Sequence, residues 1–334
     1  MTFATKSFAT DGPYFEDLEP GMRFDGAPAV TLTHGHAAVH QSIVGDRLRL
    51  PLDTELAQRV TGRGPLAHPA LVWNLAIGQS TLATRRVKAN LFYRGLAFHR
   101  APAIGDTLRT TTTVVALRQN SLKPDRADTG MAVLRVVTVD QRDRPILDFH
   151  RCAMIPLRDP GADTGRHDDL TTLGTETDIA TAAASFAGWD LSALPASAPS
   201  ASELSAGMSW EITGGDVVSS APELARLTLN IAAVHHDSSA AGGRRLVYGG
   251  HTIAIALAQI NRDLPGLVTV PAWRGCDHTA PVYEGDTLRT VLTIENLTSV
   301  GAHGTLLDLR AVVSADRDGE SVSVLDWRFL ALNR

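Results

Sequence analysis

The sequence predicts an α+β fold in which one unit, an antiparallel sheet wrapped around a central helix, is built twice along the chain. Two observations predict it. The hexapeptide Gly-Asp-Thr-Leu-Arg-Thr occurs at Gly105–Thr110 and again 180 residues later at Gly285–Thr290. In addition, each half contains one almost wholly apolar segment followed by segments with β-branched residues and alternating polarity. A tandem duplication accounts for both observations.

Further matches extend the repeat in both directions with only small gaps. In chain order they are Leu18–Phe24 with Leu204–Trp210, Gln79 with Gln259, Arg94-Gly95 with Arg274-Gly275, and Leu147–Phe149 with Leu325–Trp327. A shared hexapeptide alone can arise by chance. Several matches in one order indicate a duplication.

The apolar segments, Pro69–Gln79 and Gly250–Asn261, are predicted to be helices. Both are apolar on nearly all sides, so we expect them at the centre of each half rather than on the surface. Four strands are predicted after each helix. They are Val87–Phe98, Thr107–Leu117, Met131–Asp140 and Ile146–Ile155, then Leu267–Asp277, Thr287–Leu297, Thr305–Ala315 and Val322–Leu332. Two such sheets pairing edge to edge protect an exposed edge strand of each.

The amino-acid composition indicates where the chain divides into domains and to which broad class of protein it belongs. Residues 158–202 are rich in Ala, Ser, Thr, Gly, Asp and Pro, which indicates a linker between a domain at 1–157 and a domain at 203–334. The chain of 334 residues has 44% apolar and 20% charged residues, typical of soluble globular proteins. We expect a short helix within the linker.

Charge and cysteine content exclude several functions. The net charge of −5 and an aromatic content of 5% argue against nucleic-acid binding. The two cysteines, Cys152 and Cys276, make neither a disulfide framework nor a cysteine-rich metal site. We expect no metal and no cofactor. Because neither a secretory signal nor a membrane-spanning run is visible, we expect a cytoplasmic protein without membrane contact.

Several motifs resemble the MaoC-like dehydratases of the double hotdog type, the (R)-specific enoyl-CoA hydratase group. Tyr14–Gly21 is similar to the first strand of that family, and Arg245–Thr252 is similar to the start of its central helix. The pattern also resembles the mesaconyl-CoA hydratase branch. The resemblance covers most of both halves and omits the linker. It implies a tandem double hotdog.

The catalytic motif of that family is an acid or amide, a His five residues later and an Asp two residues further on. In the second half Asn230, His235 and Asp237 match it. In the first half Asp46 matches the first position, but Pro51 stands where the His is expected. Since proline cannot exchange a proton, the resemblance implies one active site, in the second half.

Hydration of an enoyl thioester requires a base for water, a proton for the α-carbon and donors for the thioester oxygen. His235 can serve as the general acid/base because imidazole titrates near neutral pH. The resemblance implies the backbone N–H of Gly250 as the oxyanion donor, at a helix N-terminus that favours negative charge. Asn230 departs from the usual Asp, and an amide orients water or imidazole without exchanging a proton.

Other residues near the motif are expected to contact substrate. They are Asp237, Arg244, Arg245, Tyr248, Gly249 and His251. The arginines can meet CoA phosphates, or form an ordinary solvated turn. His236 and His251 can also be structural, and Asp277-His278 is expected to pack near the site.

The expected activity is that of a hydro-lyase acting on an acyl-CoA or acyl-carrier thioester. A hotdog thioesterase is an alternative, although its usual Asp or Glu on the central helix is missing from Thr252–Ile260. A non-catalytic acyl-CoA-binding protein is a third possibility, motivated by Pro51 and Asn230. Two fused hotdogs already form a pseudo-dimer, so we expect a monomer or a homodimer.

Overall fold

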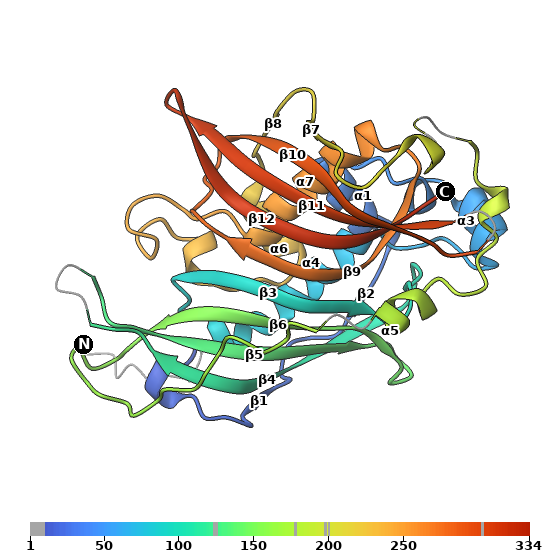
Figure 1. The fold of residues 1–334 in the computed structure, drawn as a ribbon. Helices are drawn as coiled ribbons and strands as arrows, with labels where there is room; N and C mark the ends of the chain where they lie inside the picture. The colour runs from blue at the N-terminus through green and yellow to red at the C-terminus, as the bar shows by residue number, and fades with distance from the viewer. Residues whose placement is uncertain (1–10, 123–125, 177–178, 197–198, 200, 302–303) are drawn as a thin grey trace.

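A computed structural model shows the two halves joined in one continuous sheet (Figure 1). It describes residues 11–122, 126–176, 179–196, 199, 201–301 and 304–334. The first half contributes β1 (Arg23–Phe24), β2 (Val30–Thr31), β3 (Ala89–Phe98), β4 (Thr107–Gln119), β5 (Thr129–Val139) and β6 (Pro145–Pro156). The second contributes β7 (Ser209–Glu211), β8 (Asp216–Val217), β9 (Leu267–His278), β10 (Thr287–Ser299), β11 (Thr305–Arg317) and β12 (Glu320–Asn333). The expected α+β double hotdog is confirmed.

These described strands pair antiparallel in the order β1-β4-β5-β6-β3-β9-β12-β11-β10-β7, with β2 beside β4 and β8 beside β10. The halves meet where β3 pairs with β9. Phe92 lies opposite Asp277, and the 180-residue offset carries this pair onto Ala272 and Ala97, which also pair. The seam therefore has an approximate two-fold symmetry that the sequence repeat dictates.

The central helices are α4 (Pro69–Gln79) and α7 (Gly249–Asp263), which lie against one face of the sheet (Figure 1). Every residue of α4 is buried, as is every residue of α7 from Gly250 to Asn261. Helices that are apolar all round become stable only where neighbours cover every side. Here the sheet covers one side and the other central helix covers another, so the prediction of two buried helices is confirmed.

The repeated glutamine has the same structural role in both halves. The Oε1 atoms of Gln79 and Gln259 accept hydrogen bonds from the hydroxyls of Thr110 and Thr290, each at 2.6 Å. Their amide nitrogens donate to the carbonyls of Leu108 and Leu288. A buried amide needs such partners. The repeat thus preserves a bond that ties each helix to the strand carrying the repeated hexapeptide.

The remaining helices are α1 (His34–Val44), α2 (Arg49–Leu52), α3 (Thr54–Thr61), α5 (Ile179–Ala184) and α6 (Ala221–Leu227). Short 3-10 helices cover Phe15–Asp17, Ser80–Thr84, Leu191–Ala193, Ala201–Glu203 and Ala233–His235. Helix α5 is the short helix expected in the linker. Helices α1 and α3 were not predicted, although their N-termini are capped by the side chains of Thr33 and Asp53.

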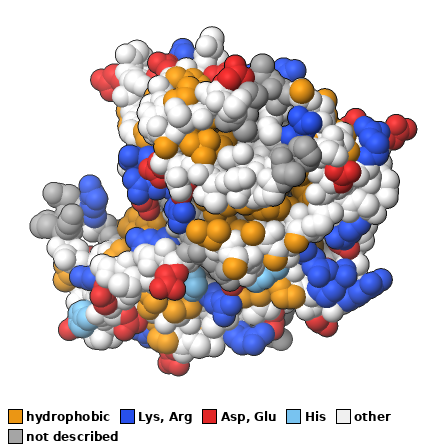
Figure 2. All heavy atoms as spheres, turned by 45° about the vertical axis from the view of Figure 1, so that its right-hand side comes forward, with side chains coloured by type: hydrophobic (Ala, Val, Ile, Leu, Met, Phe, Trp, Pro, Cys, Tyr) orange, Lys and Arg blue, Asp and Glu red, His pale blue; other side chains and the backbone are white. Residues whose placement is uncertain are grey.

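The linker packs onto the molecule along its length. His167 bridges to Arg118 of β4, and Leu170 is buried against the outer face of the first half. Gly95 is required here, because it has a φ of 60° and a Cβ atom would lie 2.8 Å from the carbonyl oxygen of Gly174. Figure 2 shows hydrophobic side chains gathered across the middle of one face of the molecule, with Lys and Arg side chains around them.

In the described part of the chain, no helix is long and apolar enough to cross a membrane.

Candidate active site

A cavity of about 540 Å³ lies where the two halves meet. Its walls come from β3 and β6 of the first half, and from the loop before α7, the start of α7 and the end of β9 in the second. Asn230 and His235 both line it. Among the described residues, no aspartate or glutamate lines this cavity. A cavity of this size suits a small acyl group with part of a longer carrier.

His235 ends the 3-10 helix Ala233–His235, whose backbone turns the imidazole back toward the strand-like segment before α7. Its Nδ1 atom lies 2.8 Å from the carbonyl oxygen of Leu246. Because a carbonyl only accepts, Nδ1 carries the proton and the neutral ring keeps a lone pair on Nε2. The carbonyl therefore fixes the tautomer that a general base requires.

Burial lowers the pKa of His235 to about 4, while the hydrogen bond to Leu246 opposes this shift. The electrostatic effects of His236 and Arg151 contribute to the same lowering of the His235 pKa. A positively charged ring is disfavoured in a desolvated site that already holds a cation. The imidazole is therefore neutral near pH 7 and is able to accept a proton.

Asn230 is 2% exposed and lies just before this turn. Its Oδ1 accepts the backbone N–H of Ala232 at 3.0 Å, which leaves Nδ2 as the group that the side chain can offer to the cavity. The Nε2 atom of His236 donates to the Asn230 carbonyl oxygen at 2.6 Å. His236 is thus a structural residue that holds the loop. Asn230 can donate a hydrogen bond to an oxygen atom in the cavity.

The two glycines at the start of α7 face different neighbours. Gly249 lines the cavity, and a Cβ atom there would lie 2.6 Å from the ring of His278. Gly250 faces α4 instead, and a Cβ atom there would lie 2.0 Å from Oδ1 of Asn74. Gly250 allows the close approach of the central helices. Of the two glycines, Gly249 is among the residues that line the cavity, and the role of the Gly250 N–H as oxyanion donor stays a prediction.

Tyr248 also lines the cavity and precedes the first residue of α7. It is 2% exposed, and its hydroxyl donates to the carbonyl oxygen of Asn74 at 3.0 Å. The helix N-terminus is therefore held against α4. Unpaired N–H groups at such a terminus attract negative charge.

Four predicted substrate contacts do not line the cavity. Asp237 accepts hydrogen bonds from Ser239 in its own turn. Arg244 and Arg245 lie within 3.5 and 3.4 Å of carboxylate oxygens of Asp286 and Glu284. His251 is fully buried, because one step along the helix from Gly250 points its side chain into the core. Any contact of these four side chains with substrate stays a prediction.

Several cavity residues were not predicted from the sequence. They include Lys88, Tyr93, Arg126, Arg151 and Thr252. One signal was available for Arg151, since this arginine stands directly before the apolar run Cys152–Ile155. His278 was expected near the site, and its ring lies against Gly249. In the described residues, no group of three potential metal ligands comes together.

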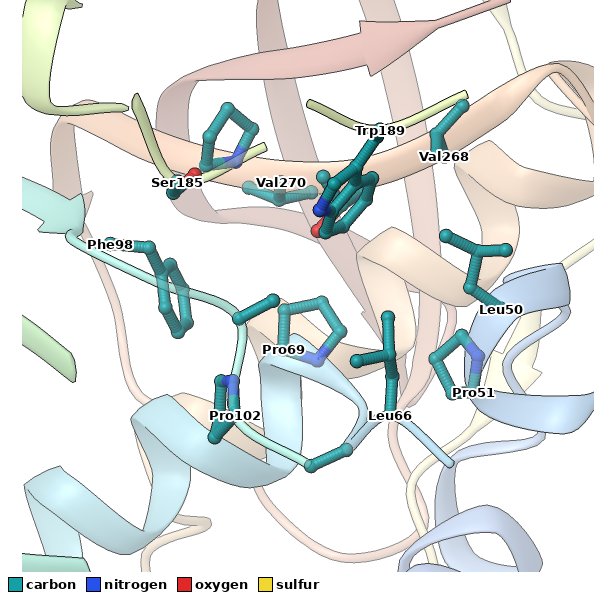
Figure 3. A pocket seen from close by; sticks show the side chains of 14 residues that line it. Leu50, Pro51, Leu66, Pro69, Phe98, Pro102, Ser185, Trp189, Val268 and Val270 are labelled. Carbon is teal, nitrogen blue, oxygen red and sulfur yellow. The ribbon is translucent and has the colours of Figure 1, made fainter. Parts of the chain in front are cut away.

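The corresponding cleft of the first half is nearly closed. It has a volume of about 20 Å³ and is lined by Pro51, Pro69, Phe98 and Trp189 among other residues (Figure 3). Trp189 of the linker extends into it (Figure 3). The carboxylate of Asp46 lies beside this cleft, 3.0 Å from Nε2 of His68, and accepts hydrogen bonds from Asn261.

Proteins of known name and structure resemble this chain over nearly its whole length. It is 30% identical to β-methylmalyl-CoA dehydratase of Chloroflexus aurantiacus, covering 92% of this chain and 89% of that protein. It is 26% identical to mesaconyl-CoA hydratase of Cereibacter sphaeroides, covering 83% and 82%. No family model matches the chain.

Two solved structures are similar in fold. A double-hotdog protein of Mycobacterium tuberculosis, described as a conserved hypothetical protein essential for bacterial survival during infection, is 55% identical with a TM-score of 0.89, covering 97% of this chain and 99% of that one. A putative MaoC-domain dehydratase of Chloroflexus aurantiacus is 26% identical with a TM-score of 0.82, covering 97% and 98%. With the fold, the cavity and the relatives in agreement, the chain belongs to the MaoC-like family of double-hotdog hydratases and dehydratases.

Proposed function

We propose that the protein adds water to, or removes it from, the double bond of an enoyl-CoA thioester, with His235 as the general acid/base. One observation carries the proposal. His235 presents a neutral imidazole to a cavity in which no described carboxylate takes part, and the hydrogen bond of its Nδ1 leaves the Nε2 lone pair to accept a proton. Two relatives are named as a CoA-thioester dehydratase and a CoA-thioester hydratase, which supports CoA rather than a carrier protein.

In the hydration direction, Nε2 of His235 takes one proton from water while the water oxygen bonds to the β-carbon. The electron pair of the double bond moves toward the thioester carbonyl, whose oxygen gains enolate charge. The imidazolium then returns its proton to the α-carbon, so that the elements of one water molecule are added. Since no carboxylate of the residues that the structure describes lines the cavity, we assign both proton transfers to the same imidazole.

The enolate oxygen needs donors that are present before the reaction begins. We propose the backbone N–H of Gly249, at the start of α7, in place of that of Gly250. Gly249 lines the cavity and its lack of a side chain leaves room for the thioester. Nδ2 of Asn230 is the proposed donor to the attacking water, because its Oδ1 is already engaged by Ala232.

We propose that the cleft of the first half is catalytically silent. Pro51 cannot exchange a proton, and Trp189 occupies the cleft beside it. Lys88 and Arg126 line the cavity that contains His235, and both side chains are exposed. They are the proposed contacts for phosphate groups of CoA, ahead of Arg244 and Arg245, whose guanidinium groups face carboxylates.

A thioesterase is the competing function, since the hotdog fold serves that reaction too. It requires a base or nucleophile at the thioester carbon, commonly an Asp or Glu on the central helix. The cavity lining offers neither, which favours the hydro-lyase. A non-catalytic acyl-CoA-binding protein is the remaining alternative, and a monomer or homodimer stays our expectation for the assembly.

One panel separates these functions. Purified protein is incubated with crotonyl-, longer enoyl- and mesaconyl-CoA, and both loss of the enoyl absorbance and release of free thiol are followed. We expect the absorbance to fall without thiol release. Thiol release would assign a thioesterase, and binding without turnover would assign an acyl-CoA-binding protein.

A further inference from the structure

The loop of residues 228–236, here called the motif loop, carries Asn230 and His235 and is held by the first half of the molecule. The backbone N–H of Ile231, directly after Asn230, donates to Oγ1 of Thr81 at 3.0 Å. Thr81 is 2% exposed and lies in the short 3-10 helix that follows α4. Its own hydroxyl proton goes to a carbonyl oxygen of α4 at 2.5 Å. One buried hydroxyl therefore connects the end of α4 to the motif loop.

The end of α4 also touches the motif loop directly. Gly78 lies so close to it that a Cβ atom would stand 1.8 Å from the carbonyl oxygen of Thr228 and 3.1 Å from the backbone nitrogen of Asn230. Glycine destabilises a helix relative to alanine, so its presence in α4 calls for a reason. The repeat offset matches Gly78 with Ala258, so the second central helix does without this glycine. The close approach of the motif loop explains why α4 has it.

The motif loop needs such support because its backbone is strained. Leu229, the residue before Asn230, has a φ of 56°, in the left-handed region that residues with a side chain rarely adopt. A conformation of this kind persists only where surrounding contacts fix it. The contacts with α4 and with Thr81 lie on both sides of Leu229 along the chain, and the N–H of Ala233 adds a bond to the carbonyl oxygen of Arg85 at 3.0 Å. The first half thus holds the strained residue and Asn230 together.

The other half has the reciprocal contact with a different target. The repeat offset matches Thr81 with Asn261, which lies near the end of α7. Nδ2 of Asn261 donates to the two carboxylate oxygens of Asp46 at 3.0 and 2.9 Å. The second central helix therefore engages the side chain of the opposite motif, whereas Thr81 binds only backbone. This difference leaves the amide of Asn230 to the cavity of the second half.

Resting on the proposed function for the roles of Asn230 and His235, we infer that Thr81 and Gly78 are positioning residues of the reaction. They fix the motif loop against the end of α4, and thereby set where the amide and the imidazole stand in the cavity. Displacement of a catalytic group by about 1 Å can lower a rate by about 10²-fold. The first half, whose own cleft is nearly closed, thus contributes to the chemistry of the second.

The test removes the connecting hydroxyl without changing the shape of the side chain. Thr81→Val leaves the Ile231 N–H without its acceptor. We expect kcat for enoyl-CoA hydration to fall by about 10- to 100-fold while KM changes less than about threefold, because the loop shifts and the cavity wall keeps its shape. Thr81→Ser keeps the hydroxyl and should restore kcat to within about threefold of the wild type. Gly78→Ala should also lower kcat at nearly constant KM, although Gly78 is not among the described residues that line the cavity.

Asn261→Leu is the matched control, because it removes the corresponding buried hydrogen bonds at the end of the other central helix. It should lower the urea midpoint, as Thr81→Val does, and leave kcat within about threefold of the wild type. A Thr81→Val enzyme with the kcat of the wild type overturns the inference. A rise in KM at constant kcat also overturns it, since Thr81 would then be a substrate contact. An equal loss of kcat in Asn261→Leu overturns it by assigning a general effect of stability.

Hydrogen–deuterium exchange separates this inference from the proposed function. If the wild type hydrates no enoyl-CoA, the hydro-lyase proposal fails, but the support of the motif loop by Thr81 is still measurable. We expect the peptide of residues 228–236 to exchange about tenfold faster in Thr81→Val, the scale of one lost hydrogen bond. It should exchange at the wild-type rate in Thr81→Ser and in Asn261→Leu. Equal exchange in all four proteins rejects the inference.

Discussion

The two halves of the molecule have the same fold and differ at the N-terminal ends of their central helices. Both keep the glutamine–threonine bond between helix and strand, each at 2.6 Å. In the second half, the helix start opens into a cavity of about 540 Å³ that contains His235. In the first half, the equivalent space has shrunk to about 20 Å³ and contains Pro51. Both halves thus keep the same packing between helix and strand, whereas the spaces at their helix starts differ greatly in volume.

The comparison extends to the charged groups. Asp46 of the first half is buried but satisfied by His68 and Asn261. Burial is the largest single influence on the pKa of Asp46 and raises it. The interaction with His68 and the hydrogen bonds together outweigh burial, so the pKa is lowered. Asn230 of the second half is neutral and lines the same cavity as the imidazole of His235. The first half thus has a carboxylate at the first position of the catalytic motif without the histidine, and the second half has the histidine without a carboxylate at the first position.

The largest expected effect is that of His235→Ala. Removal of the imidazole should lower kcat for enoyl-CoA hydration by about 10²- to 10⁴-fold, the usual contribution of a positioned general acid/base. Pro51→Ala is the matched control at the corresponding place, and it should change kcat less than about threefold, within the spread of minor mutational effects. Hydratase assays on both variants check this. An active His235→Ala enzyme would remove the proposed mechanism.

The linker residue Trp189 should matter for stability and little for activity. Truncation of a large buried aromatic costs about 3–5 kcal/mol, and the partly exposed Trp189 should cost less, about 1–3 kcal/mol. Trp189→Ala should therefore lower the urea midpoint while kcat holds. If kcat falls with unchanged stability, the first cleft contributes to function, and the asymmetry between the halves is smaller than proposed.

The fold was predictable because its signals are local. Strand alternation, two apolar helices and the Gln79–Gln259 match all follow from residues close in sequence or from the repeat. The cavity was less predictable because it joins distant segments. Arg151, for example, is oriented by a hydrogen bond to Ser80, which lies 71 positions away in the sequence. The choice between Gly249 and Gly250 depends on about 100° of helix rotation, which a motif does not specify.

The pH dependence of the wild type is expected to reflect the desolvated imidazole. A base with a pKa near 4, instead of the usual 6.5, stays neutral far into the acid range. The value of kcat/KM should therefore hold below pH 6.5 and decline only as the pH approaches 4. A decline centred at 6.5 would contradict the burial of His235.

The stability of the folded protein should be measured over the same pH range. His251 and His278 also have pKa values lowered to about 4 by burial. In the unfolded chain these rings take up protons near pH 6.5, while the folded chain resists protonation until about pH 4. Stability is thus complete above 6.5 and falls as the pH decreases through this window. Circular dichroism at each pH separates unfolding from loss of the base.

The smallest and most specific effect is expected from Asn230→Asp, which gives the second half the carboxylate that the first half has at Asp46. A negative charge beside the imidazole favours its charged form, so the pKa of His235 should rise from about 4 toward its usual value. The acid limb of kcat/KM should therefore move to higher pH, while the rate on the plateau holds or rises because a second proton-exchanging group is present.

Asn230→Ala, which lacks both amide and charge, should lower kcat by less than His235→Ala and leave the acid limb near its original pH. Asp46→Asn, the exchange in the opposite direction, should leave the limb unmoved and weaken the fold, because His68 loses its carboxylate. A limb that stays at the wild-type pH in Asn230→Asp would show that this side chain lies too far from His235 to act on it.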